Sequence, residues 1–288
     1  MRAGIIAVLG LLSVLLAGCG MLRLAYGQAD TMAFRWLDGY ADFDEAQSVQ
    51  VRTELDAWFA WNRRTQLVDY AELLGRVDAS LPGSLTPEAT CEMWGEVRRR
   101  VDIGVERAVP ALANVALSLK PAQLAHIERR YDTLNREYRE QYLQPDPARR
   151  RTEAVKRIVS RAEWLYGSLD ETQRARLATW VNDSPFDARL SLQERQLRQQ
   201  ESLRVLRALT AGPASPEQAQ AAIRAYVQGV GRSPRETYRR YQSEWTRHAC
   251  AMAADLHNST SPAQRQTASR KLRGWAGDLR QLAGESGA

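Results

Sequence analysis

Residues 119–138 read LKPAQLAHIERRYDTLNREY, and this stretch decides the fold class. Its apolar residues recur at steps of three and four, as on one face of an α-helix. They are Leu124, Ile127, Tyr131, Leu134 and Tyr138. Just before them, Pro121 suits a first helical turn, and Gln123 can bond back to the residue that precedes the helix. The stretch therefore predicts an amphipathic helix with its own start signal.

The same form of helix start recurs along the chain. An apolar residue precedes a Ser, Thr or Asp cap, then Pro or Glu follows, and Gln often stands at the third helical position. These starts lie at 43–47, 85–88, 119–123, 169–173, 214–218 and 260–264. Lys120 is not a capping residue, so we expect its helix to depend on Pro121 and on a Leu119–Leu124 hydrophobic staple.

Helical spacing of apolar residues extends through most of the chain. It is clear in 44–79, 152–166 and 197–209, and no segment alternates apolar and polar residues for long. Pro and Gly mark breaks at 82–83, 144–147, 184–185, 212–213 and 229–234. We therefore predict an all-α fold, a bundle-like array of about eight to ten helices.

The first residues resemble a bacterial lipoprotein signal. Arg2 precedes an apolar run over 5–16 that is too short to span a bilayer. Leu16-Ala17-Gly18-Cys19 is similar to the lipobox, in which the cysteine is acylated and the chain is cut before it. An ordinary signal peptide with an accidental cysteine is the alternative. We expect a lipoprotein signal peptide over 1–18, lipidation of Cys19 and a lipidated tether over 19–30.

This resemblance implies where the protein works. Acyl chains on Cys19 would anchor it to a membrane, because each buried methylene contributes about 0.8 kcal/mol. Residue 20 is Gly rather than Asp, which in the usual sorting pattern implies the outer membrane, with the domain on its periplasmic face. The formal net charge of +6 is a weak indication of acidic partners, and nucleic acid lies in another compartment.

Two further cysteines, Cys91 and Cys250, remain. In an oxidising compartment an even pair favours a disulfide, which would join an early helix to a late one. Two separate buried thiols are the alternative. We expect a single helical domain over 31–288, either continuous or composed of two similar halves that meet near residue 184.

Two resemblances to known families accompany these features. The helix starts at 85–88, 119–123 and 169–173 resemble the LTxxQ motif of Spy-like periplasmic chaperones, which hold unfolding clients on a basic, partly apolar face. A second set of residues extends along most of the chain: Tyr26, Ala29-Asp30, Trp36 to Tyr40, Asp42-Phe43, Trp61 to Arg64, Leu119 to Gln123, Asn135 to Tyr138 and Leu256 to Thr260. It is similar to a family of proteobacterial lipoproteins of unknown function. That family implies the compartment and a helical fold, and no activity.

No catalytic signature stands out in the sequence. A nucleophile elbow, a phosphate-binding glycine loop and metal-ligand spacing are all missing. Aspartates cluster within 30–44 as paired carboxylates do in wall-cleaving enzymes, but Asp44 fits an N-cap. His257 to Thr260 predicts a helix C-terminus, with Asn258 left-handed and His257 against the helix dipole. We predict no enzyme activity, no cofactor and no metal site.

Aromatic and basic residues gather near the N-terminus. The partner-binding candidates are Trp36, Asp38, Tyr40, Trp61, Arg63 and Arg64. Trp and Arg are favoured interface anchors, so these residues would suit a groove for partner or client segments. Core packing with bonded ring nitrogens is the alternative. The first function hypothesis is thus a non-enzymatic, lipid-anchored protein that binds other envelope proteins, chaperone-like or as an assembly factor.

Basic runs suggest a second hypothesis. They lie at 98–100, 126–130, 149–151 and 238–241, and each spans about one helical turn. Solvated helix faces explain them plainly. Contact with anionic lipid or lipopolysaccharide is the sharper interpretation, because a membrane-anchored domain lies within a Debye length of that surface. A module that binds lipopolysaccharide or peptidoglycan is therefore the second hypothesis, and a cell-wall hydrolase is the third.

Overall fold

The computed structural model describes residues 21–284, so the predicted signal peptide and Cys19 lie outside the described residues. Within this range there are 12 helices and no strand, which confirms the all-α prediction and is close to the expected number. The helices are α2 (Met21–Gly27), α3 (Ala29–Ala41), α4 (Glu45–Thr65), α5 (Leu67–Ser80), α6 (Pro87–Ser118), α7 (Pro121–Tyr142), α8 (Pro147–Tyr166), α9 (Glu171–Asn182), α10 (Ala188–Thr210), α11 (Pro216–Gly231), α12 (Glu236–Ser259) and α13 (Pro262–Gly284).

Two helix boundaries differ from the expectation. Residues 21–27, expected within the tether, form α2, and Leu22 and Tyr26 of this helix pack against α5 and α13. The continuous apolar spacing of 44–79 hides a break at Gln66, which donates its N–H to the Asn62 carbonyl at the end of α4. The tether therefore does not extend over 21–30, because burial of two large side chains docks this segment on the fold.

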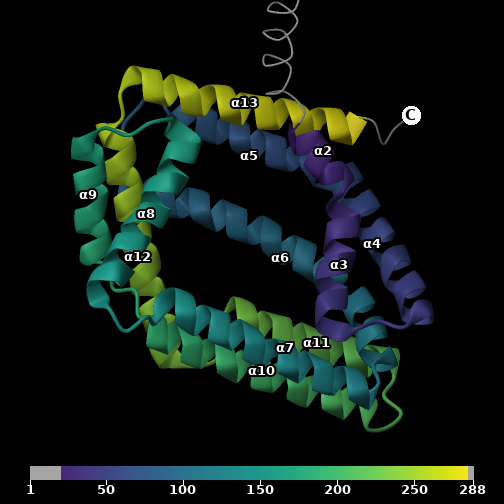
Figure 1. The fold of residues 1–288 in the computed structure, drawn as a ribbon. Coiled ribbons are helices and arrows are strands. Elements are labelled where there is room, and N and C mark those ends of the chain that lie inside the picture. The colour runs from purple at the N-terminus through teal and green to yellow at the C-terminus, as the bar shows by residue number, and fades with distance from the viewer. Residues whose placement is uncertain (1–20, 285–288) are drawn as a thin grey trace, which may run out of the picture.

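The helices form a four-sided frame (Figure 1). Its sides are α13 lying along α5, α3 with α4, α7 with α10 and α11, and α8 and α9 with α12. The long helix α6 crosses the frame as a brace, packing against α12 at one end and against α4, α10 and α11 further along. Helices from before and after residue 184 thus pack against each other throughout, and the halves considered from the sequence are not separate packing units.

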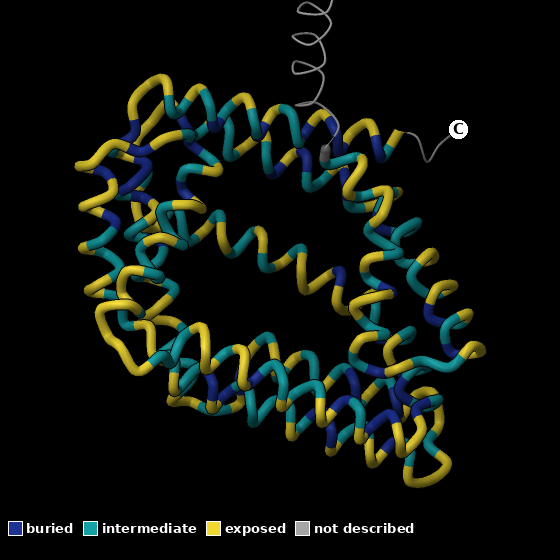
Figure 2. Tube along the Cα trace, viewed as in Figure 1, coloured by how far each residue is buried: buried dark blue, intermediate teal, exposed yellow. Residues whose placement is uncertain are grey.

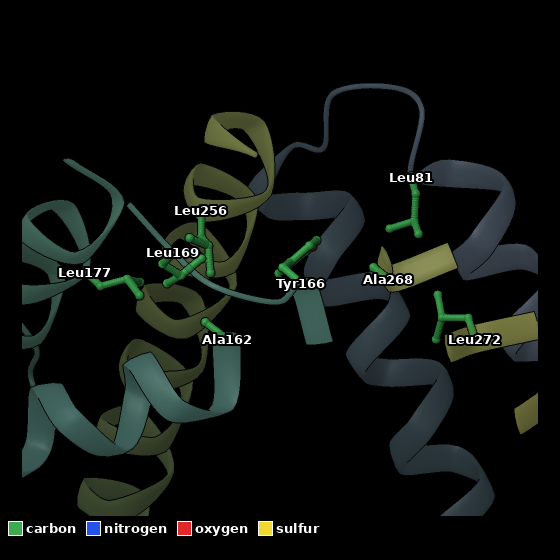
Figure 3. Packing of buried hydrophobic residues seen from close by; sticks show 8 residues of the cluster. All are labelled: Leu81, Ala162, Tyr166, Leu169, Leu177, Leu256, Ala268 and Leu272. Atoms are coloured by element: carbon green, nitrogen blue, oxygen red, sulfur yellow. The ribbon is translucent and has the colours of Figure 1, made fainter. Parts of the chain in front are cut away.

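Apolar burial is distributed over the joints of the frame rather than over one central core. One cluster joins α5, α8, α9, α12 and α13 around Tyr166 (Figure 3). Others lie where α6 meets α10 and α11, where α3 meets α7 and α10, and where α13 meets α5 and α2. Each fully buried Leu or Ile contributes roughly 1.5 to 3 kcal/mol, so the joints hold the frame together.

Paired glutamines fasten two of these joints. Gln47 and Gln123 exchange side-chain amide hydrogen bonds of 3.1 and 2.7 Å, and Gln173 and Gln264 exchange two of 2.9 Å. Each glutamine also accepts the N–H of its own cap residue and donates to a carbonyl before its partner's cap. Those carbonyls belong to Ser118, Asp42, Ser259 and Ser168. The repeated helix start therefore joins α4 to α7 and α9 to α13.

The helix that begins after Lys120 starts with Pro121, as expected from the sequence. Leu119 and Leu124 lie in one buried cluster, as the predicted staple requires. Lys120 adds an ion pair, because its Nζ lies 2.7 Å from Oδ2 of Asp44. Asp44 itself is the predicted cap of α4 and accepts the N–H of Gln47 at 2.9 Å. That hydrogen bond, together with the bond from Lys120, lowers the pKa of the Asp44 carboxyl.

Candidate functional site

The predicted candidates on α3 divide between an exposed ring and a structural carboxylate. Trp36 is 63% exposed and packs against Tyr40, with ring centroids 4.9 Å apart. Tyr40 in turn contacts Tyr131 of α7 at 6.2 Å. Asp38 accepts the N–H of Phe43 through Oδ1 at 2.9 Å, so it closes the end of α3. Only the two rings are placed for contact with a partner.

The candidates on α4 point to different neighbours. Trp61 packs beside Trp58 with ring centroids 5.8 Å apart, and Arg107 of α6 lies 5.8 Å from the Trp61 ring. Arg63 lies over the ring of Tyr26 in α2, at 5.4 Å. It lines a small pocket of about 300 Å³ together with Arg64. The structure therefore does not bring the six candidates into one groove, because Trp61 contacts α6 and Arg63 contacts α2.

The tryptophans fit both interpretations of the aromatic residues. Trp58 donates its ring N–H to the Gly104 carbonyl at 3.0 Å, and Trp180 donates to Asp255 at 2.8 Å, as packed tryptophans do. Four others are exposed. They are Trp36, Trp94, Trp164 and Trp245.

One face of α6 carries a row of uncovered apolar side chains, here called the apolar stripe. It consists of Trp94, Val97, Val101, Val105 and Leu112, which are 36 to 57% exposed. Their spacing of three, four and seven residues places them on the same side of the helix. None of residues 91–103 is buried, and Figure 2 shows this part of the brace as exposed or half-buried. The stripe is about 27 Å long at 1.5 Å per residue.

A groove of about 1160 Å³ lies beside the stripe, bounded by α6, α11 and α12. Covalent and ionic contacts hold the three helices together around it. The disulfide Cys91–Cys250 joins α6 to α12, with Cα atoms 5.4 Å apart, and confirms the predicted pairing. Arg224 of α11 lies 2.7 Å from Glu106 of α6, and the turn 232–235 links α11 to α12. The groove is therefore held open by a rigid triangle of helices.

Four arginines line this space, here called the arginine-lined groove. They are Arg98, Arg232, Arg239 and Arg247. Arg98 donates to the Gly231 carbonyl at 2.9 Å, Arg239 to the Ser233 carbonyl at 2.9 Å, and Arg247 to Ser243 Oγ at 3.1 Å. Within residues 21–284, none of the four has a carboxylate partner. The fold thus unites arginines from two basic runs that lie far apart in the sequence.

A buried carboxylate positions the turn of the groove. Glu194 of α10 is 2% exposed and bonds Arg235 through both oxygens, at 2.6 and 2.9 Å. Arg198 bonds it at 2.8 Å. Burial raises the pKa of the Glu194 carboxyl, but the bonds from Arg235 and Ser233 and the charge of Arg198 outweigh it, so the net pKa is lowered. This network fixes the turn between Arg232 and Arg239.

The end of α12 agrees with the prediction in its position and differs at Asn258. His257 is 1% exposed, with Nδ1 3.0 Å from the Tyr166 hydroxyl and Nε2 3.0 Å from the Gly83 carbonyl. The backbone of Asn258 is not left-handed. Its side-chain amide accepts the N–H of Leu85 and donates to the Leu85 carbonyl. The predicted helix C-terminus is confirmed, because α12 ends at Ser259 and Thr260 caps it by donating to the His257 carbonyl. The left-handed Asn258 is wrong, because the 81–86 loop binds its side chain. Burial lowers the pKa of His257.

Fold and site define an all-α protein: a braced helical frame with an apolar stripe and an arginine-lined groove on its central helix. A family model described as a family of unknown function, DUF6279, matches residues 39–216, more than half of the chain. The chain belongs to this family, which agrees with the second resemblance as far as a family of unknown function; the lipoprotein character of that family stays a prediction. No curated protein and no solved structure matches it. Among the described helices, none has the length and apolar character needed to cross a bilayer.

Proposed function

We propose that this protein is a lipid-anchored envelope protein without enzyme activity, which binds apolar segments of other proteins as a chaperone or an assembly factor. The apolar stripe of α6 is the observation that carries the proposal. Large apolar side chains left uncovered in a row, between charged neighbours, are typical of interaction sites. A row of about 27 Å matches about five turns of a partner helix laid along α6.

The frame makes α6 a rigid support for such binding. The disulfide to α12 holds one end of the helix, and packing against α11 holds the other. Midway, Trp58 of α4 bonds the Gly104 carbonyl. A surface held in this way loses little conformational entropy when it binds, which favours affinity. The likeness of the helix starts to Spy-like chaperones adds little support to the proposal. In this chain, Gln47, Gln123, Gln173 and Gln264 of those starts serve to join helices.

The test removes apolar surface from the stripe without changing charge. The variant Val97→Ser/Val101→Ser is compared with Val49→Ser/Val68→Ser, whose valines are exposed on α4 and α5. Purified protein is mixed with a chemically unfolded model client, and client aggregation is followed by light scattering. We expect the wild type and the α4/α5 variant to suppress aggregation, and the stripe variant to lose most of this effect.

Salt separates this function from surface binding. Suppression through apolar contacts persists at high ionic strength, whereas binding to anionic lipopolysaccharide weakens as salt screens the charges. A wild-type protein that leaves client aggregation unchanged, or a stripe variant as active as its control, contradicts the client-binding proposal. Turnover of purified peptidoglycan by the wild type would contradict the non-enzymatic part.

The lipid anchor has its own test. Cells that express the wild type or Cys19→Ala are labelled with radioactive palmitate, and inner and outer membranes are separated. We expect label on the wild type alone and its recovery with the outer membrane, because the acyl chains attach at Cys19. Equal labelling of the two proteins, or recovery of the wild type in the soluble fraction, contradicts the anchor.

A further inference from the structure

We propose that the arginine-lined groove binds the phosphate-bearing headgroup of an anionic amphiphile. The proposal rests on charge and shape in the triangle between α6, α11 and α12, and the groove shares only Val105 with the apolar stripe. Arg98, Asp102 and Glu106 each follow a stripe residue by one position, which places the groove about 100° around α6 from the stripe.

Charge in the groove favours an anion. Four guanidinium groups line it, and none of them is neutralised by a carboxylate in the described chain. Glu106, which also lines the groove, is already paired with Arg224 at 2.7 Å. Planar guanidinium groups donate paired hydrogen bonds that match the oxygens of a phosphate. The positive charge left in the groove thus exceeds what the protein itself neutralises.

Apolar side chains in the same groove favour an amphiphile over a free ion. Ile103 and Val105 of α6 and Val227 of α11 line it together with the arginines. A volume of about 1160 Å³ exceeds what one phosphate ion fills and is slightly above the usual size of small-molecule sites, so it can hold a larger ligand. A headgroup on the arginines with its first methylenes against these three side chains would use both surfaces.

The walls of the groove are organised before binding. The disulfide fixes the corner of α6 and α12, and the Glu194–Arg235 network fixes the turn that carries Arg232. One wall residue opposes the proposed ligand, since Asp102 lines the groove and has no ion-pair partner within residues 21–284. Removal of this charge should therefore strengthen binding, an effect that loss of a merely structural residue does not produce.

The test measures binding of short-chain lipids by calorimetry, below their micelle concentration, to the purified chain carrying Cys19→Ala. The probes are dihexanoyl phosphatidic acid, dihexanoyl phosphatidylcholine and inorganic phosphate. We expect the phosphatidic acid to bind and the other two to bind at least about tenfold more weakly, because one lacks net charge and the other lacks methylenes.

Two matched double variants locate the site. Arg232→Gln/Arg247→Gln removes two exposed groove arginines, and Arg149→Gln/Arg151→Gln removes two exposed arginines of α8. We expect affinity for phosphatidic acid to fall about tenfold or more in the groove variant only, and to rise several-fold in Asp102→Asn. Circular dichroism checks that each variant is folded.

Three results would overturn the proposal. Equal binding of phosphatidylcholine would show that charge does not select the ligand, and equal binding of inorganic phosphate would identify a free anion as the ligand. An equal loss of affinity in the two double variants would assign the effect to net charge rather than to the groove.

Discussion

Gln173 makes four hydrogen bonds with one buried side chain. Its Oε1 accepts from the Asp170 N–H at 3.1 Å and from Gln264 at 2.9 Å, and its Nε2 donates to the Ser259 carbonyl at 3.0 Å and back to Gln264. Gln218 of α11 completes a similar capping box but lies exposed, and no glutamine within residues 21–284 pairs with it. The two residues therefore separate local capping from the joining of helices.

We predict that Gln173→Ala lowers the free energy of unfolding by about 3 kcal/mol, because the Gln264 amide and the Ser259 carbonyl lose buried partners. Gln218→Ala should cost only about 1 kcal/mol, as loss of a cap does. Urea denaturation followed by circular dichroism measures both values. Equal losses would mean that the pairing adds nothing to capping.

His257 makes stability depend on pH. Burial lowers its pKa from the usual 6.5, and burial also raises the pKa of Tyr166 to about 12, so the tyrosine stays protonated and donates to Nδ1. The unfolded histidine gains a proton as the pH falls through 6.5, whereas the folded one does not until lower pH. Folding is therefore weakened in that window and unaffected above it.

We predict that the free energy of unfolding falls less steeply between about pH 7 and about pH 5 in His257→Gln than in the wild type. His126→Gln, at a half-exposed position on α7, is the control for the loss of a histidine as such. Urea titrations at several pH values give the slopes. A wild-type slope in His257→Gln would assign the pH dependence to other groups.

Capping residues could be predicted from the sequence because a cap is a local structure. Asp44 and the staple at Leu119 lie where the motif places them. Which glutamine pairs with which could not be predicted, since Gln173 and Gln264 are 91 positions apart and nothing local relates them. Asn258 was mispredicted for the same reason, because its partner is the distant Leu85.

At the scale of helices, α6 shows how two glycines of one helix differ. A Cβ at Gly104 would lie 3.3 Å from Cζ2 of Trp58, at the crossing with α4. At Gly95 it would meet only the flexible end of Arg99, at 3.6 Å. Alanine stabilises a helix by about 1 kcal/mol relative to glycine. At Gly104 the contact with Trp58 opposes this stabilisation, whereas at Gly95 only a flexible side chain lies near.

We predict that Gly95→Ala raises the free energy of unfolding by up to about 1 kcal/mol. The free energy of unfolding of Gly104→Ala should be lower than that of Gly95→Ala by about 1 kcal/mol or more. The reason is that Trp58 must shift, which disturbs its hydrogen bond to the Gly104 carbonyl. Urea denaturation of the two variants gives the difference. Equal stabilisation by both would show that the crossing tolerates a methyl group.

Helices could be predicted more fully than the surfaces they expose. The apolar residues of α6 occupy a wide arc, and only the packing of α10 and α11 decides that Val109 is buried and Val101 is not. The groove was missed because Arg98 and Arg239 lie in separate basic runs, each of which resembles a solvated helix face. The candidates from Trp36 to Arg64 lie on two consecutive helices but face different neighbours.

At the scale of the whole molecule, the disulfide closes a long loop. Cys91 and Cys250 are separated by 159 positions, so their bond restricts the unfolded chain strongly. We predict that Cys91→Ser/Cys250→Ser lowers the free energy of unfolding, with about 5 kcal/mol as the upper value of a chain-entropy estimate. Urea denaturation with and without reductant measures the loss.

Thiol labelling supplies the control. In a Cys19→Ala background, denatured protein should show free thiols only after reduction. Labelling of both cysteines without reductant would contradict the disulfide, and equal stability with and without reductant would contradict its contribution.

The packing of α13 on α5 also determines at which point during synthesis the four-sided frame can be completed. α13 lies along α5 more extensively than any other pair of described helices, and α2 docks on the same pair. A ribosome makes α5 early and α13 last of the described helices, so this side cannot form before α13 has been made. For a chain that we propose is exported, the delay keeps it in the open form that a secretion channel can accept.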